Sequence, residues 1–180
     1  MKNIFRTIIA VMLAAVCALA LVACSGNEQK NNGEENNAEQ KNTGKEYDVE
    51  QLAKSIFENV KFEDEYVALV DDKDFALSSY GIDPALVADK DGVKEDAVYV
   101  SASTPEMIVC VKAVDEAAAK TVMSAVESKI SDYINNYTTY GPEQVAKLES
   151  AVKVTNGQYV VVVVSNDNSA AASFVNGLFN

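Results

Sequence analysis

Two strand-strand-helix units in the C-terminal half place the strongest constraint on the fold of this chain. Apolar runs predict the paired strands 97–101 and 107–114 in the first unit, and 151–155 and 158–165 in the second. Asn156-Gly157 lies between the last two runs and is a strong hairpin signal. Asp115 follows the first hairpin, and Asn166 or Asp167 follows the second, each where a helix N-cap is expected. Each unit therefore predicts an antiparallel hairpin followed by a helix.

Together the two hairpins predict one four-stranded antiparallel sheet in an α+β domain. Helices 115–137 and 167–179 follow the two hairpins, and we expect both on the same face because each needs the same apolar surface. The second unit begins 54 residues after the first, which an internal repeat explains. Chance explains it equally well, since the order β-β-α is common.

Both faces of this sheet are apolar. Alternation along one strand directs Met107, Val109 and Val111 to one side and Ile108 and Cys110 to the other. Residues 160–164 are valine throughout, so both faces need cover. An N-terminal helix at 48–60, capped by Asp48, and the segment 62–80 are the natural lid. The alternative is an exposed apolar face that binds a partner.

The first 24 residues have the pattern of a lipoprotein signal. Lys2 and Arg6 precede an apolar run at 8–20, and Leu21-Val22-Ala23-Cys24 fits a lipobox at every position. The apolar stretch 8–23 has 16 residues, whereas a membrane-spanning helix needs about 20. We therefore expect residues 1–23 to be removed as a signal peptide and Cys24 to carry a diacylglyceryl group. Two acyl chains anchor a protein stably in a membrane.

Behind the anchor, composition predicts a tether and then a single domain. Residues 24–46 hold one apolar side chain beyond the cysteine, Ala38, so we expect a disordered tether. Residues 47–180 are long enough for a single domain with its own core. Signal removal takes two of the 15 basic residues and none of the 27 acidic ones, which leaves a net charge of −14. That charge argues against nucleic acid as a partner.

Several kinds of chemistry are excluded or disfavoured. The chain has no histidine, so Ser-His-Asp and Cys-His systems and histidine metal ligands are impossible. Cys110 is the one cysteine left after lipidation, which rules out an intramolecular disulfide. The acidic run 58–96 fails the spacing of a calcium loop and is interpreted as a solvated surface. Ser150 and Lys153 match Ser-x-x-Lys, but the companion motifs of that chemistry are absent. The sequence holds no cofactor-binding or metal-binding motif, so neither a metal nor a cofactor is expected.

A further set of short motifs carries a family resemblance. In order along the chain, these motifs are Tyr80-Gly81-Ile82-Asp83, Glu106 opening an apolar strand, Tyr140-Gly141-Pro142-Glu143-Gln144 and Gly157-Gln158-Tyr159-Val160. The sequence resembles small Gram-positive lipoproteins built on domain of unknown function 4358, over about residues 48–178. The resemblance implies an extracytoplasmic lipoprotein and brings no catalytic residues.

The sequence favours recognition over catalysis. We expect a binding or interaction module, held at the outer face of the cell membrane by the lipid on Cys24. The candidate interaction surface comprises Tyr80, Glu106, Tyr140 and Tyr159, and the expected partner is an envelope protein with cationic patches. The alternatives are a lipoprotein that captures a small ligand or peptide and, less favoured, a hydrolase that uses carboxylates alone.

Overall fold

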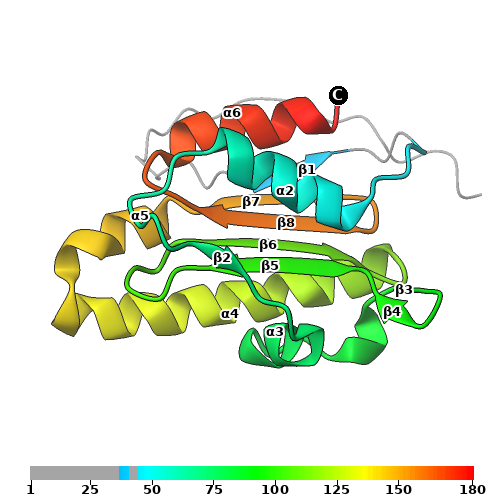
Figure 1. Cartoon of the computed structure of the whole chain (residues 1–180), viewed down its shortest axis with the longest axis horizontal. Coiled ribbons are helices and arrows are strands. Elements are labelled where there is room, and N and C mark those ends of the chain that lie inside the picture. The colour runs from blue at the N-terminus through cyan, green and yellow to red at the C-terminus, as the bar shows by residue number, and fades with distance from the viewer. Residues whose placement is uncertain (1–36, 41–43) are drawn as a thin grey trace, which may run out of the picture. The chain divides into compact units, whose positions relative to one another are not determined.

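The computed structural model describes residues 37–40 and 44–180, and these form one mixed sheet with helices on both faces (Figure 1). The strand order is β1-β7-β8-β6-β5-β2. The strands are β1 (Asn37–Gln40), β2 (Ala68–Leu69), β5 (Asp96–Val100), β6 (Met107–Lys112), β7 (Val152–Asn156) and β8 (Tyr159–Val164). All pairs are antiparallel except β1 with β7. The predicted α+β class and the union of both hairpins in one sheet are therefore confirmed, but the sheet has six strands rather than four, because β1 and β2 add an edge strand on either side.

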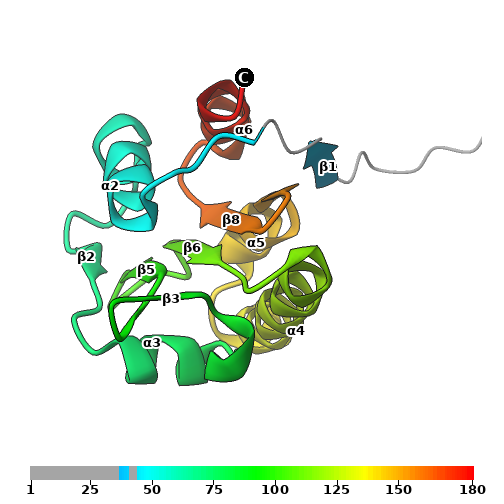
Figure 2. The ribbon, with the colours of Figure 1, turned by 90° about the vertical axis from the view of Figure 1, so that its right-hand side faces the viewer.

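The helices divide between the two faces of the sheet. Helices α2 (Val49–Asn59) and α6 (Asn168–Leu178) lie on one face, and α3 (Lys73–Ser79) and α4 (Glu116–Tyr140) lie on the other (Figure 2). The prediction that the helices after the two hairpins share a face is wrong. All six residues of β8 are buried, so each face of the sheet needs its own helical layer.

This division also decides the question of an internal repeat. Strands β6 and β8 are antiparallel neighbours at the centre of the sheet. A two-fold axis exchanging the two hairpins would stand perpendicular to the sheet and would leave α4 and α6 on one face. Because these helices lie on opposite faces, the two units do not form a symmetric structural repeat.

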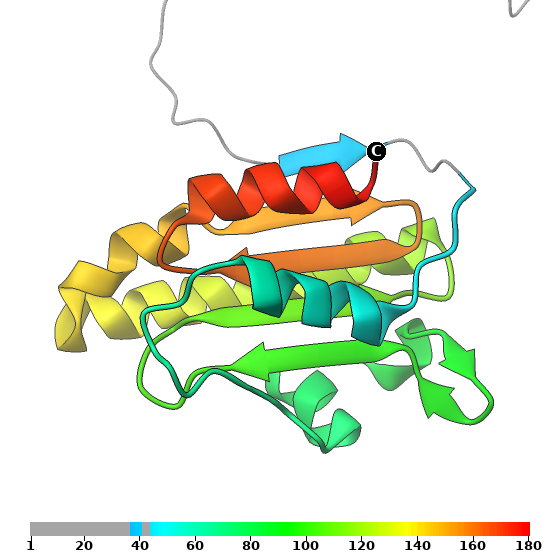
Figure 3. The same cartoon turned by 45° about the horizontal axis from the view of Figure 1, so that its top comes forward.

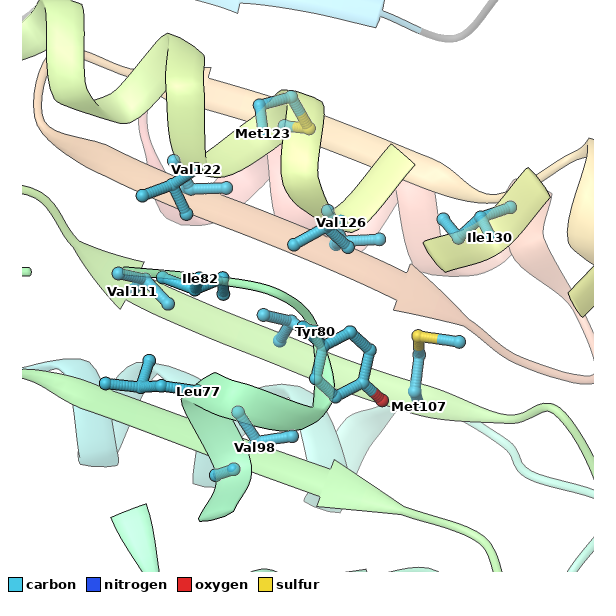
Figure 4. Close-up of a cluster of buried hydrophobic side chains, with 14 of the residues drawn as sticks. Leu77, Tyr80, Ile82, Val98, Met107, Val111, Val122, Met123, Val126 and Ile130 are labelled. Carbon is cyan, nitrogen blue, oxygen red and sulfur yellow. The ribbon is translucent and has the colours of Figure 1, made fainter. Parts of the chain in front are cut away.

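Two apolar clusters fill the spaces on either side of the sheet. Met107, Val109 and Val111 belong to the cluster beneath α3 and α4 (Figure 4), whereas Ile108 and Cys110 belong to the cluster beneath α2 and α6. The predicted alternation is thus confirmed. Each fully buried aliphatic side chain contributes about 1.5–3 kcal/mol, so neither face can remain bare.

Cover for the sheet comes from within the chain, as expected, but in a different arrangement. The N-terminal helix α2 packs on the same face as α6 (Figure 3). The segment 62–80, expected beside it, instead supplies the edge strand β2 and then α3 on the opposite face. The prediction that these two segments cover one face together is therefore right for α2 and wrong for α3, which covers the other face.

Helix boundaries follow the predicted caps. The backbone N–H of Gln51 donates to Asp48 Oδ1 at 2.9 Å, that of Ala118 to Asp115 Oδ1 at 2.7 Å, and that of Ala170 to Asp167 Oδ1 at 3.0 Å. Helix α4 ends at the Gly141-Pro142 break. A 3₁₀ turn η2 (Pro142–Gln144) and the short helix α5 (Val145–Glu149) follow it.

A small hairpin, β3 (Asp89–Lys90) with β4 (Val93–Lys94), projects beside the main sheet. Its two turn residues both have positive φ, 56° at Asp91 and 83° at Gly92. Tight hairpin turns favour these angles because they match the twist of the flanking strands. This hairpin was not predicted from the sequence. Another 3₁₀ turn, η1 (Pro84–Leu86), connects α3 to it.

The predicted tether differs from the structure at four residues. Asn37–Gln40 form β1, which pairs in parallel with β7, from Asn37 opposite Lys153 to Gln40 opposite Asn156. Composition predicts disorder from a lack of apolar side chains, but an edge strand offers backbone hydrogen bonds to any sequence. The signal peptide and Cys24 lie outside the described residues. Within residues 44–180, no helix combines the length and apolarity needed to cross a membrane.

Candidate functional site

The four residues of the predicted interaction surface are not brought together. Tyr80 is 3% exposed in the core beneath α4 (Figure 4), and Tyr159 is 5% exposed in the core on the other face of the sheet. The Tyr159 hydroxyl accepts the backbone N–H of Tyr47 at 3.0 Å. Glu106 is buried, and Tyr140 alone is open to solvent, at the end of α4. A common surface through these side chains does not exist.

Glu106 instead fastens a loop to the turn of the β5–β6 hairpin. Its Oε1 accepts the N–H of Glu63 at 2.8 Å and lies 3.3 Å from Lys147 Nζ. Its Oε2 accepts the N–H groups of Glu63 and Asp64, both at 2.9 Å, and the Thr104 hydroxyl at 3.1 Å. Buried carboxylates are stable when their oxygens are engaged in this way. The role of Glu106 is therefore structural.

Asp64 extends the same network and is equally engaged. Its Oδ2 accepts hydroxyl hydrogen bonds from Ser101 and Ser103, and its Oδ1 accepts the N–H of Tyr66 at 2.9 Å. The bond from Ser101, then the one from the Tyr66 backbone, holds the pKa of Asp64 below its ordinary value. Both carboxylates in this network have partners on every oxygen, which leaves nothing for a ligand to satisfy.

A different region has the properties of a binding site. Three adjoining hollows of about 190, 340 and 180 Å³ lie around the N-terminal end of α2, the start of α3 and the β3–β4 hairpin. We call them together the acidic cleft; Figure 3 shows the start of α2 and the β3–β4 hairpin at the same end of the sheet. The ionisable lining residues are Glu46, Asp48, Glu50, Asp71, Lys73, Asp89, Lys90, Lys94, Glu95, Asp96 and Lys112. Carboxyl groups thus outnumber ammonium groups by seven to four.

Lys73 and Asp96 form the most unusual pair in the acidic cleft. Lys73 Nζ donates to the carbonyl oxygens of Asp96 at 2.6 Å and Lys94 at 3.2 Å, and it lies 3.1 Å from Glu50 Oε1. The nearer carboxylate oxygen of Asp96 is 3.9 Å away from the same nitrogen, beyond hydrogen-bond distance. Asp96 is 1% exposed, and neither oxygen accepts a hydrogen bond from any residue in 44–180.

The environment of Asp96 changes its acidity. Its pKa is raised to about 6: burial is the main cause, the charge of Lys73 opposes the rise, and the neighbouring carboxylates Glu50 and Asp74 add to it. A carboxyl group that titrates near neutrality beside a hollow is a typical feature of functional sites, although structural ion pairs also produce it. The interpretation of the acidic run as a solvated surface is wrong at Asp64 and Asp96, which are both buried.

A second ion-pair cluster borders the largest hollow. Lys112 Nζ lies 3.3 Å from Glu95 Oε2 and 3.4 Å from Glu46 Oε1. Lys112 is the last residue of β6, and Glu46 precedes α2, so the pair joins the start of the domain to the central sheet. Lys112 carries one positive charge against these two carboxylates, so the cluster keeps a net negative charge beside the hollow that it lines.

The other chemistry considered from the sequence finds no support in the geometry. Ser150 Oγ donates to the carbonyl oxygen of Ala146 at 2.8 Å, while Lys153 Nζ lies 3.2 Å from Glu127 Oε1. The two residues of the Ser-x-x-Lys match therefore have separate partners. Among the described residues, no three cysteine or carboxylate side chains are grouped to hold a metal ion. Cys110 is fully buried, and burial raises the pKa of its thiol, which makes it inert.

Fold and cleft together define a three-layer α+β domain with a carboxyl-rich cleft at one end of its sheet. Residues 73–165 match the domain of unknown function DUF4358, and the chain belongs to this family. The matched segment runs from the start of α3 to the end of β8 and includes Lys73, Asp96 and Lys112. No curated protein and no solved structure matches the chain.

Proposed function

We propose that this protein is an extracytoplasmic lipoprotein, held in the cell membrane by lipid on Cys24, whose domain binds a cationic protein partner of the envelope through the acidic cleft. The observation that carries the proposal is the excess of carboxyl groups over ammonium groups in the lining of the cleft, seven to four, which favours a cationic partner. The signal pattern at residues 1–24 supports the membrane location.

The size of the hollows favours recognition over catalysis. Pockets that enclose a small-molecule ligand measure about 300–1,000 Å³. Two of the three hollows, at about 190 and 180 Å³, are smaller than this range, and the third is at its lower end at about 340 Å³. Such hollows fit side chains projecting from a partner surface. The net charge of −14 after signal removal steers cationic surfaces toward the domain.

The lipid anchor is tested by replacing its attachment point. Cys24→Ala is expected to abolish incorporation of a palmitate analogue and to leave the protein as an uncleaved precursor, because the thiol is the acceptor of the diacylglyceryl group. Metabolic labelling followed by gel fluorescence measures incorporation, and Cys110→Ala serves as the control that keeps the lipobox intact. Equal labelling of the Cys24→Ala variant and the wild type would refute the anchor.

The partner is tested by crosslinking in intact membranes, with a cleft variant beside a matched control. Glu46→Gln combined with Asp89→Asn removes two charges from the cleft, whereas Asp132→Asn combined with Glu149→Gln removes two from exposed positions elsewhere. We expect the cleft variant to lose the crosslinked protein and the control to keep it. Association should weaken as salt rises, because exposed charges are screened over about 10 Å at 0.1 M. Equal capture by both variants would place the contact elsewhere.

Capture of a small ligand is the second candidate, and the hollow of about 340 Å³, which lies within the range of ligand pockets, favours it. It makes a distinct prediction. A thermal shift from one compound of a sugar, amine or peptide library, without any crosslinked protein, would move the assignment from a protein partner to a small ligand. A hydrolase of this kind needs two carboxylates that face each other across a cleft large enough for the substrate. The two hollows that border Lys73, at about 190 and 180 Å³, are smaller than that, so a hydrolase is not proposed.

A further inference from the structure

We propose that the outer edge of β7 is a binding site for an extended segment of a partner protein, which lies parallel to β7 and takes the place of β1. Residues 37–40, here called the strap, close this edge of the sheet when no partner strand is bound. The lining of the acidic cleft includes no residue of β1 or β7, so the site is separate from it. Three observations carry the inference: the direction of the backbone groups of β7, the weak hold of the strap, and the support of β7 within the sheet.

The register of the sheet decides which backbone groups of β7 face outward. A two-residue turn, Gly157-Gln158, joins β7 to β8, so the closing pair of Asn156 and Tyr159 is hydrogen-bonded. Alternation along the strand then directs the backbone groups of Lys153 and Thr155 away from β8. The strap pairs with β7 on this side. An extended segment therefore binds this edge through its backbone alone.

The parallel register also distinguishes the two sides of the strap. In a parallel pair, a residue whose groups face the neighbouring strand bonds to the two residues that flank its partner. The two outward-facing residues of β7 stand opposite Asn37 and Glu39, so the N–H groups that point toward β7 are those of Ala38 and Gln40. The N–H groups of Asn37 and Glu39 point the other way, which provides a matched control for substitutions.

The strap is held weakly. It has four residues, and its pairing is parallel, which is slightly less stable per residue than antiparallel pairing. Its sequence, Asn-Ala-Glu-Gln, contains no β-branched or aromatic residue, the types that favour strands. A backbone hydrogen bond contributes a net 0.5–1.5 kcal/mol or so, whereas ordering one residue costs about 1–2 kcal/mol. The free energy of docking is therefore close to zero, and a better strand displaces the strap.

β7, by contrast, keeps its place without the strap. Its inner edge pairs with β8 over all five of its residues, and Figure 3 shows the strap on the opposite edge. Val152 and Val154 are each 1% exposed in the cluster beneath α2 and α6. On the other face, Lys153 Nζ lies 3.2 Å from Glu127 Oε1 of α4. The edge is thus preformed, so an incoming strand binds without the cost of ordering its receptor.

An extended protein segment is the occupant that this edge fits. Backbone donors and acceptors at strand spacing are matched by another backbone, as in the addition of a peptide strand to a sheet. Register places the second residue of such a segment opposite Val154, where a β-branched residue stabilises the pair more than Ala38 does. A second copy of this chain brings the same Asn-Ala-Glu-Gln sequence and gains nothing over the strap, whose effective concentration is about millimolar.

The strap is tested by amide hydrogen exchange of the full-length protein in detergent micelles, measured by mass spectrometry. Ala38→Pro combined with Gln40→Pro removes the two N–H groups that point toward β7, and this is the open-edge variant. Asn37→Pro combined with Glu39→Pro removes the two that point away, which an edge strand tolerates. Exchange of the outward-facing β7 amides should rise about tenfold or more in the open-edge variant and stay within about twofold of the wild type in the control.

Replacement of the strap is tested with a synthetic peptide of residues 35–42 that carries Ala38→Val and Glu39→Thr, which supply strand-forming residues. At about 1 mM, the order of the effective concentration of the strap, the peptide should restore slow exchange of the outward-facing β7 amides in the open-edge variant. In the wild type it should speed the exchange of residues 37–40 about twofold or more, because it releases the strap. A control peptide of residues 35–42 with Ala38→Pro and Gln40→Pro should do neither.

Three results would overturn the inference. Equal exchange of the outward-facing β7 amides in the wild type and both proline variants would show that the strap does not occupy the edge. Failure of the strand-forming peptide to slow exchange in the open-edge variant would show that the edge does not bind a strand. A peptide that binds this variant and leaves residues 37–40 of the wild type unchanged would show that the strap is not replaceable. None of these results bears on the acidic cleft, which the crosslinking of the Glu46→Gln and Asp89→Asn variant tests separately.

Discussion

Replacing Asp96 with asparagine should stabilise the folded protein at neutral pH, although Asp96 is among its most buried residues. Asparagine has nearly the same shape and carries no charge, so it removes the cost of holding an ionised carboxylate without donors. Lys73 is not left unpaired by the change, because its hydrogen bonds go to two backbone carbonyls and its closest ion pair is with Glu50. The substitution therefore removes a penalty and breaks no hydrogen bond of the carboxylate.

The magnitude follows from the acidity of the group. The folded pKa of about 6 lies above the ordinary value of 3.8, so the folded state binds the proton more tightly than the unfolded state. At 1.36 kcal/mol per pKa unit, ionised Asp96 costs about 3 kcal/mol of stability above pH 6. That cost declines as pH falls through 6 and is largely gone by about pH 4, where the side chain is protonated in the folded state.

The assay is urea unfolding of the wild type and Asp96→Asn across this pH range. We expect the difference in unfolding free energy to favour the variant and to shrink by about 2 kcal/mol between pH 7 and pH 4. Asp132→Asn should give a difference that barely changes with pH, because its carboxylate is exposed. A gap for Asp96→Asn that is constant with pH, or that widens in acid, would refute the assignment of a raised pKa to this residue.

Two further predictions concern buried groups that do not line the cleft. Glu106→Gln should lower the free energy of unfolding in urea by about 3 kcal/mol, because an amide nitrogen replaces one of two oxygens that accept backbone N–H groups. Thr104→Val removes one hydroxyl donor and should lower it by about 1 kcal/mol. Equal losses for the two variants would refute the network. Cys110 should resist iodoacetamide in the native protein and react only at the rate of unfolding, because its thiol is buried. Peptide mapping by mass spectrometry measures the labelling. Rapid labelling of the native protein would contradict the burial.

Local patterns predicted the elements of the fold well, because the interactions that define them are local. Asp48, Asp115 and Asp167 cap helices where capping chemistry placed them, and Asn156-Gly157 turns the second hairpin. The distribution of helices over the two faces was not predictable in the same way. It depends on which face each connection crosses, and β8 is apolar on both sides, so its sequence carries no preference.

The candidate site escaped prediction for a related physical reason. Asp96 stands in an acidic run whose composition indicates a solvated surface, and no local pattern distinguishes it from its neighbours. Its state arises from three segments: α3 brings Lys73, α2 brings Glu50, and the end of β4 and the start of β5 present the carbonyls that compete for the ammonium donors. The Asp96 carboxylate has no donor because the donors of its neighbour Lys73 are already engaged, and that engagement is a property of the tertiary structure alone. The tyrosines and Glu106, which stood out in the sequence, are by contrast fully occupied in packing and hydrogen bonding, apart from Tyr140. Where the fold already engages the motif residues in packing and hydrogen bonds, a buried group without a hydrogen-bond partner is the better guide to function.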